Sequence, residues 1–166
     1  KLSNETGQEQ GDDTSSRRGP MREFSCSLPM SLLRAREAVM RHFRASLRRF
    51  GITEQQWRVL RALTSGDSFE VTELAEATFL LAPSLSRILK DLDERGLILR
   101  RTLKSDLRRG LVSISPQGLA LIERAGAESE VIYREITGRY GSERLAELQS
   151  LLRQLEECLD GPEIVG

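Results

Sequence analysis

The chain is poor in the residues on which most catalytic and metal sites depend. Its 166 residues include two cysteines and one histidine. Cys26 and Cys158 stand far apart and match no metal-ligand spacing, and a lone His42 cannot form a histidine cluster. The sequence also lacks a Ser/His/Asp arrangement, a glycine-rich phosphate loop and a Cys-x-x-Cys motif. We therefore expect a protein that is not an enzyme and that holds neither a metal nor a cofactor.

Aromatic residues and long apolar runs are scarce as well. Aromatic residues make up 5% of the chain and hydrophobic residues 39%, which predicts an aliphatic, helix-rich core. No run reaches the ~18 apolar residues that a membrane span needs, and no signal peptide is visible, so we expect a cytoplasmic protein without a membrane partner. The first 22 residues carry almost no large apolar side chain, which predicts a flexible tail or processing remnant over residues 1–27. Residues 161–166 are predicted to form a second tail.

The chain has no net charge, but its charges are segregated. Basic and acidic residues number 25 each. Residues 34–61 carry eight basic and two acidic side chains, residues 84–110 eight and four, and residues 119–166 five and ten. Such a distribution suits a protein with one face for DNA and another end for solvent or a partner subunit. The alternative is that the charged helix faces are merely solvated, and for residues 34–61 alone we favour it.

Residues 82–96 predict a short amphipathic helix. Apolar side chains recur at positions i, i+3, i+4 and i+7, which forms one buried stripe of Leu85, Ile88, Leu89 and Leu92. Pro83 suits the first turn, where its missing N–H costs nothing. Gly96 suits the left-handed residue after the last turn.

A basic β-hairpin is predicted to follow this helix. Strands are expected at 97–102 and 111–115, joined by the long charged loop 103–110. A helix followed by a basic hairpin is typical of a winged helix-turn-helix, which reads DNA with the helix in the major groove. Arginines at the hairpin tip suit phosphates or a narrow minor groove. The predicted DNA contacts are Pro83, Ser84, Ser86, Arg87, Lys90, Arg101, Lys104, Asp106, Arg108 and Arg109.

The segment before the predicted reading helix is expected to form three helices and a strand. A helix over 30–50 is predicted from an apolar stripe of Leu33, Met40, Phe43 and Leu47. Thr53 and Gln56 form a capping box for a helix over 54–64, which turns Trp57, Leu60 and Leu63 inward. A strand at 69–71 is expected to pair with the hairpin. Thr72 is expected to cap a helix over 73–78.

Two further helices are predicted after the hairpin. Ser115 is expected to cap a long helix that starts at Pro116 and breaks at 138–141. Ser142 is then expected to cap the last helix. The leucines of this last helix recur in a near-heptad that predicts a packing seam: Leu145, Leu148, Leu151, Leu152, Leu155 and Leu159.

These motifs carry a resemblance to the MarR family of bacterial transcription regulators. The junction Leu-Asp-Glu-Arg-Gly-Leu at 92–97, the Asp-Leu-Arg of the hairpin at 106–108 and the Ser-Ile-Ser-Pro-Gln-Gly at 113–118 match the family pattern. The upstream runs at 35–44 and 53–58 resemble its branch of repressors of aromatic-acid catabolic operons, that of homoprotocatechuate degradation. The chain departs from the pattern in the adjacent arginines Arg108 and Arg109, so either of them could enter a groove.

The resemblance implies a fold, a partner and a ligand. The fold is mainly α with a small β wing: a winged helix-turn-helix reader at 53–115, and long N- and C-terminal dimerisation helices at 28–50 and 116–160. The implied partners are a second copy of the chain, a palindromic double-stranded operator and a small aromatic acid effector, for a repressor associated with the bacterial nucleoid. The alternative is that the terminal helices close an intramolecular bundle. We favour the dimer because the resemblance implies it and because a helix-turn-helix monomer makes too few base contacts for operator-level affinity. The implied ligand residues, at the junction of these parts, are Arg36, Met40, His42, Arg44, Trp57 and Arg61.

Each ligand candidate also has a plainer interpretation. Trp57 suits a core position, His42 an exposed position, and Arg36 a pair with a carboxylate. A second hypothesis is a regulator of the same type that is switched by oxidation of Cys26 or Cys158. A reactive cysteine needs an electropositive, exposed setting, whereas Cys158 follows two glutamates and Cys26 has only Arg22 nearby in sequence.

Overall fold

The structure, a computed structural model, describes residues 23–103 and 106–161, and for residues 102, 103 and 106–109 it describes the backbone alone. Lys104, the first 22 residues of the predicted N-terminal tail and residues 162–166 lie outside the described residues. The chain divides into two compact units between Ala38 and Val39. The second unit holds the C-terminal part of the first long helix and all the described helices and strands that follow it.

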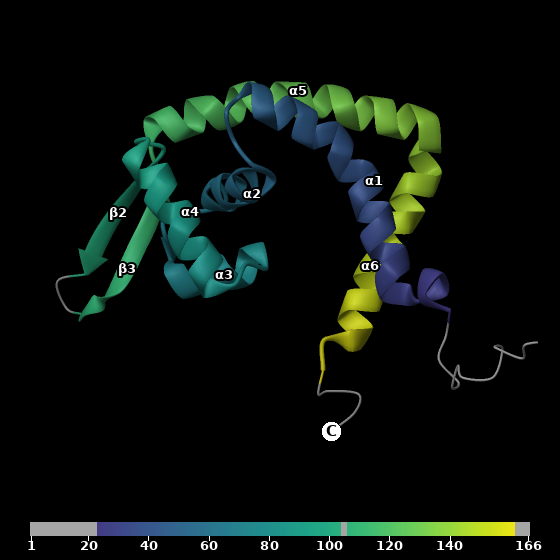
Figure 1. The fold of residues 1–166 in the computed structure, drawn as a ribbon, viewed down its shortest axis with the longest axis horizontal. Helices are drawn as coiled ribbons and strands as arrows, with labels where there is room; N and C mark the ends of the chain where they lie inside the picture. Colours follow the sequence, from purple (N-terminus) through teal and green to yellow (C-terminus); the bar gives the residue numbers. More distant parts are fainter. Residues whose placement is uncertain (1–22, 104–105, 162–166) are drawn as a thin grey trace, which may run out of the picture. The chain divides into compact units, whose positions relative to one another are not determined.

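The fold class predicted from the sequence is confirmed: the chain is mainly helical with one small sheet and a winged helix (Figure 1). The described elements are η1 (Phe24–Cys26), α1 (Leu28–Arg49), α2 (Glu54–Leu63), β1 (Phe69–Glu70), α3 (Val71–Thr78), α4 (Ala82–Glu94), β2 (Ile98–Leu103), β3 (Asp106–Ile114), α5 (Pro116–Tyr140) and α6 (Ser142–Leu159). Among these helices, none has an apolar stretch of the length that a membrane crossing requires.

Local capping explains where three of the described helices begin: α2, α3 and α5. Thr53 and Gln56 form the predicted capping box at α2, and the Ser115 hydroxyl accepts the Gly118 N–H at the start of α5. The predicted cap at Thr72 is wrong. Helix α3 already starts at Val71, because Glu70 and Glu73 form a reciprocal box of their own.

The start of the last helix also differs from the prediction. Ser142 is the first helical residue of α6 and does not cap it, since the chain turns at Gly141 with φ 97°. Helix α5 runs through Gly138 to Tyr140. The break predicted over 138–141 therefore occurs at Gly141 alone, where the positive φ requires glycine.

The sheet has the antiparallel order β1-β3-β2. Phe69 and Glu70 of β1 pair with Val112 and Leu111 of β3, as the sequence predicts. The prediction of a loop over 103–110 is wrong, because β3 begins at Asp106 and pairs with β2 as far as Leu103. The dense charge of this segment favours a loop in the sequence. An exposed hairpin nevertheless tolerates charged side chains, because the hydrogen bonds that pair its strands are made by the backbone.

One aliphatic core joins α2, α3, α4 and the sheet. The side chains buried in it include Leu60, Leu63, Leu74, Leu85, Leu89, Leu92, Ile98 and Val112. The predicted stripe of α4 is thus confirmed, with Ile88 half-buried beside it. In α1, Phe43 and Leu47 are buried as predicted, but Leu33 is exposed.

The two long C-terminal helices leave apolar side chains uncovered. Within the described chain α6 has no buried residue, and four leucines of its seam are exposed: Leu148, Leu151, Leu152 and Leu159. The second half of α1 is held on α5, since the rings of Phe43 and Tyr133 lie 4.9 Å apart and the Ser46 hydroxyl donates to Glu128 at 2.7 Å.

Candidate nucleic-acid interface and ligand site

Helix α4 presents a polar face opposite its buried stripe. Ser84, Ser86 and Arg87 are exposed, as is Pro83 in the first turn. Leu85 and Leu89 hold the helix in the core, so the polar face is fixed in direction while its side chains remain accessible. This is the arrangement that a helix in a major groove requires.

Other polar residues of α4 serve the fold. The Gln56 side chain donates to Asp91 at 2.7 Å, and Arg95 donates to Asp91 at 3.2 Å and to the Gly51 carbonyl at 3.0 Å. These bonds join α4 to the start of α2, so Asp91 and Arg95 position the reading helix. Lys90 lies 3.8 Å from Glu94 in an exposed ion pair, which is weak and leaves Lys90 available to phosphate.

The hairpin lies beside α4 (Figure 1). Arg101 of β2 is exposed, and so is Arg100, which is not among the predicted DNA contacts. The backbones of Asp106, Arg108 and Arg109 lie in β3, but their side chains are outside what the structure describes. The Asp-x-Arg signal therefore belongs to a strand and not to a loop.

An ion cluster centred on Glu54 links three helices. Its carboxylate accepts from Arg44 of α1 at 2.9 Å and from Arg58 of α2 at 3.2 Å. Arg58 also donates to the Thr78 carbonyl, the last of α3, at 2.8 Å. The Glu54–Arg58 pair has the i, i+4 spacing from which it could have been predicted, but the reach to Thr78 has no sequence signal.

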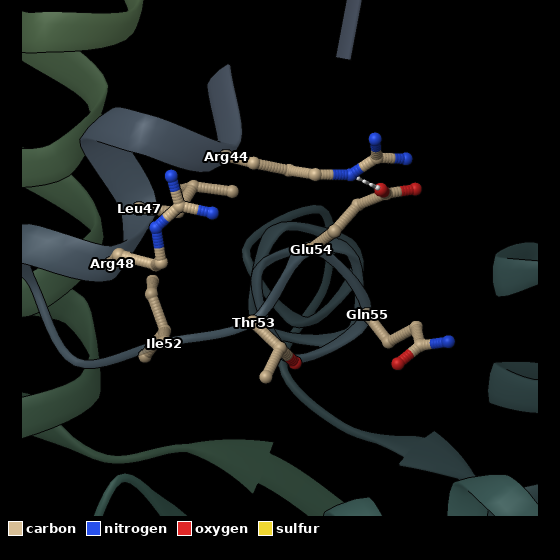
Figure 2. A pocket seen from close by; sticks show the side chains of 7 residues that line it. All are labelled: Arg44, Leu47, Arg48, Ile52, Thr53, Glu54 and Gln55. Atoms are coloured by element: carbon tan, nitrogen blue, oxygen red, sulfur yellow. Dashed lines mark hydrogen bonds and ion pairs between the residues drawn. The ribbon is translucent and has the colours of Figure 1, made fainter. Parts of the chain in front are cut away.

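A hollow of about 410 Å³ lies where α1 ends and α2 begins. Figure 2 shows Arg44 and Arg48 extending from α1 and the Arg44 guanidinium meeting Glu54. The other lining residues are Leu47, Ile52, Thr53 and Gln55. Its size falls in the range of small-molecule sites. Its wall carries two arginines and Glu54, which engages Arg44, so the net charge of the lining is positive.

The five predicted ligand residues of the second unit do not form one cluster. Trp57 and Arg61 come together, since the Arg61 guanidinium carbon lies 5.9 Å from the Trp57 ring centre. Arg61 is exposed, and Trp57 is half-buried with one side against the core. Of these five, only Arg44 lines the hollow of Figure 2.

The remaining candidates are His42, Met40 and Arg36, and each has its own surroundings. His42 lines a separate hollow of about 200 Å³ with side chains of α5, among them Glu135 and Arg139. Met40 is half-buried on α1. Arg36 pairs with Glu37 at 2.9 Å, which is the plainer of its two interpretations.

The surroundings of Glu128 favour its ionised form. The Ser46 hydroxyl donates to its carboxylate, and the Arg49 guanidinium both donates to it and attracts its charge. Both partners favour the ionised form, so they lower the pKa of Glu128 below its ordinary value.

The cysteines offer little support for redox chemistry. Both are exposed. The Cys26 sulfur lies 3.9 Å from a carboxylate oxygen of Glu23, which is the opposite of the electropositive setting typical of reactive thiols. In the described part of the chain, His, Cys, Asp and Glu side chains nowhere gather in a group of three that could hold a metal ion.

Comparison with known proteins gives consistent matches. A model of the MarR family matches residues 50–109. The homoprotocatechuate degradative operon repressor of Escherichia coli is 38% identical over 128 residues, which cover 77% of this chain and 86% of that protein.

Solved structures agree with these matches. NadR in complex with 4-hydroxyphenylacetate superposes with a TM-score of 0.69 at 34% identity, over 82% of this chain and 97% of that one. The transcriptional repressor CouR bound to a 23-mer DNA duplex superposes with a TM-score of 0.73 at 26% identity, over 78% and 92%.

Proposed function

Because this chain belongs to the MarR family of transcription regulators, which bind DNA through a winged helix, we propose that it is the homodimeric repressor of an aromatic-acid catabolic operon. A small aromatic carboxylate releases it from a palindromic operator. The observation that carries the proposal is the Trp57–Arg61 pair on α2, the helix that is bonded to both the reading helix and the end of α3.

Reading of DNA is assigned to the exposed face of α4 and to the hairpin. Arg87 is the candidate for a guanine, because a guanidinium can donate to both acceptors on the major-groove edge of that base. Ser84 and Ser86 lie on the same accessible side. Arg101, Arg108 and Arg109 supply the charge that phosphates or a narrow minor groove attract.

A homodimer is supported by the uncovered leucines of α6. Four exposed leucines on one helix are a surface that water solvates poorly and a second copy could bury. Two reading helices also double the base contacts, and a two-fold dimer reads half-sites one helical turn apart. The domain assignment follows: residues 28–50 and 116–160 form the dimer region, and residues 53–115 read DNA.

The effector site is assigned to Trp57 and Arg61. An aromatic carboxylate needs an apolar ring surface and a cation, and a planar guanidinium binds a carboxylate through two parallel hydrogen bonds. Arg44 is less suited, since Glu54 already engages it. The similar protein NadR was solved with 4-hydroxyphenylacetate, which makes hydroxyphenylacetates the first probes to use.

The test starts from DNA. Duplexes enriched from a random pool by the full chain serve as the operator, and binding is followed by fluorescence anisotropy. We expect two half-sites in the enriched sequence, and release when 4-hydroxyphenylacetate, 3,4-dihydroxyphenylacetate, a hydroxycinnamate or 6-hydroxynicotinate is added. A true effector at a hundred times its dissociation constant should also raise the free energy of unfolding by about 2.7 kcal/mol.

Matched controls separate the parts of the proposal. The amide of the active acid lacks the carboxylate and should not release DNA. Arg61→Ala should remove the response, while Arg48→Ala, on the hollow of Figure 2, should keep it. The reverse result moves the effector to that hollow, and release by none of the acids refutes the effector class.

A further inference from the structure

The turn between α3 and α4 exposes large apolar side chains. Phe79 is 83% exposed and Leu81 is 78% exposed, whereas Leu80 between them packs on the core. Ala82 and Pro83, which follow directly, are exposed as well. We call Phe79, Leu81, Ala82 and Pro83 the turn patch. Burial of these side chains does not explain their presence, because folding leaves them in water.

At both ends of this turn, the residue present is not the type that would make the local backbone most stable. Phe79 has a left-handed backbone, with φ 51° and ψ 42°, and is the one non-glycine residue with positive φ in the described chain. Glycine takes this conformation without a steric penalty, whereas a residue with a Cβ pays about 1–2 kcal/mol. Leu81 stands at the N-cap of α4, where it supplies no side-chain cap. Two such departures within three residues are typical of a functional position.

The chemistry of the turn indicates what it contacts. Ala75, Glu76 and Leu80 line an open hollow there together with Phe79 and Leu81. Its surface is mainly hydrocarbon, and its one ionisable side chain, Glu76, is exposed and repels phosphate. A phosphate group is therefore a poor occupant, and an apolar group is a good one.

The position of the turn patch indicates which apolar group it contacts. Ala82 and Pro83 belong to the first turn of α4, so the patch is continuous with Ser84 and Arg87 on the face assigned to the major groove. The apolar group exposed in a major groove is the 5-methyl of thymine, which phenylalanine and alanine side chains contact.

We propose that Phe79 and Leu81 are specificity-determining residues that read a thymine methyl group in each operator half-site. The inference rests on the proposed DNA reading by α4 and deepens it. Arg87 distinguishes bases by hydrogen bonds, and the turn patch adds discrimination by apolar contact, which hydrogen bonding cannot supply.

The test removes the methyl group from the DNA and the ring from the protein. Each thymine of the enriched duplex is replaced in turn by deoxyuridine, symmetrically in both half-sites, and the affinity of the full chain is measured. Loss of one methyl contact should weaken binding about fourfold per half-site, as expected for one buried methyl-sized group. Phe79→Gly should lower the affinity for the thymine duplex and abolish the uracil penalty at the position concerned. Leu81→Ala should reduce that penalty.

Folding does not confound the result. Phe79→Gly and Phe79→Asn both tolerate the left-handed backbone, so neither should melt below the original chain, and both should lose the penalty. Phe24→Ala removes a similarly exposed phenylalanine, 74% accessible, from η1 and should leave the penalty unchanged.

The outcomes separate this inference from the function on which it rests. A chain that enriches no duplex overturns both. A chain that binds its duplex but shows no uracil penalty, or the same penalty in Phe79→Gly, overturns the thymine contact alone. Unchanged DNA affinity in Phe79→Gly has the same meaning.

Discussion

Gly118 shows how one missing methyl group decides a local packing. A Cβ at this position would lie 2.1 Å from the Leu97 carbonyl oxygen and 3.0 Å from a carbon of Ile114. The same Leu97 carbonyl accepts the Ser115 N–H at 3.1 Å. The start of α5 thus rests directly on the backbone that enters β2.

Gly118→Ala should therefore destabilise the fold by about 1–3 kcal/mol, the usual cost of overpacking. Chemical denaturation measures it. Gly126 is the matched control, because it lies on the same helix and a Cβ there meets nothing within 4 Å. Gly126→Ala should raise stability by up to about 1 kcal/mol through helix propensity. Equal effects of the two changes would contradict the close packing at Gly118.

Residue-level signals in the sequence were dependable where the chemistry is local. The box of Thr53 and Gln56, the cap at Ser115 and the positive φ of Gly96 were all predicted and confirmed. The error at Thr72 arose because Glu70 can cap through the same reciprocal bonds. The left-handed Phe79 carries no sequence signal, since it stands where glycine is expected.

At the scale of elements, Glu128 fastens α1 to α5. Its carboxylate accepts from Ser46 and from Arg49, which stand about eighty residues earlier in the chain. No periodicity or motif in a single sequence predicts a bond of this separation. The sequence could place both helices, but it could not say which side chains join them.

The lowered pKa of Glu128 predicts a pH effect. A carboxyl whose pKa is lower in the folded chain stabilises it above the ordinary value and loses that contribution as the pH falls towards the folded value. Glu128→Gln should therefore reduce stability at neutral pH, and the difference from the original chain should shrink as the pH falls below about 4.5. Unfolding by urea across this range measures it. Glu130→Gln, an exposed neighbour on α5, should show no such convergence.

Replacing Arg87 and replacing the hairpin arginines should affect DNA binding in different ways. Arg87→Ala should relax base preference at one position per half-site, with a loss of about 1–3 kcal/mol against the preferred base. Arg108→Ala with Arg109→Ala should weaken binding to all sequences and flatten the dependence on salt. Anisotropy titrations over a salt series distinguish the two. A uniform loss in Arg87→Ala would make that residue a phosphate contact.

At the scale of the whole molecule, the proposed release from DNA requires the effector and the operator to weaken each other's binding. If the effector favours a spacing of the two reading helices that misses the half-sites, operator DNA must weaken effector binding by the same factor. Titration calorimetry of the active acid, with free and with operator-bound protein, measures the factor for the acid, and anisotropy titrations of the operator with and without the acid measure the factor for DNA. Trp57→Ala should bring them close to one while leaving effector-free DNA binding nearly intact. Equal effector affinity in the two states would refute release by this mechanism.

The register of the sheet gives the wing two different stiffnesses. Of all the residues in β3, Leu111 and Val112 alone have partners on both sides, in β1 and in β2. Farther out, Gly110 and Asp106 pair with β2 only, and the register shifts between Thr102 and Leu103. Amide hydrogens at the inner end should thus exchange with solvent far more slowly than those of the outer ladder. If the hairpin contacts DNA as proposed, its base stays fixed beside α4, while the outer ladder, which is paired on one side only, can adjust to grooves of different width.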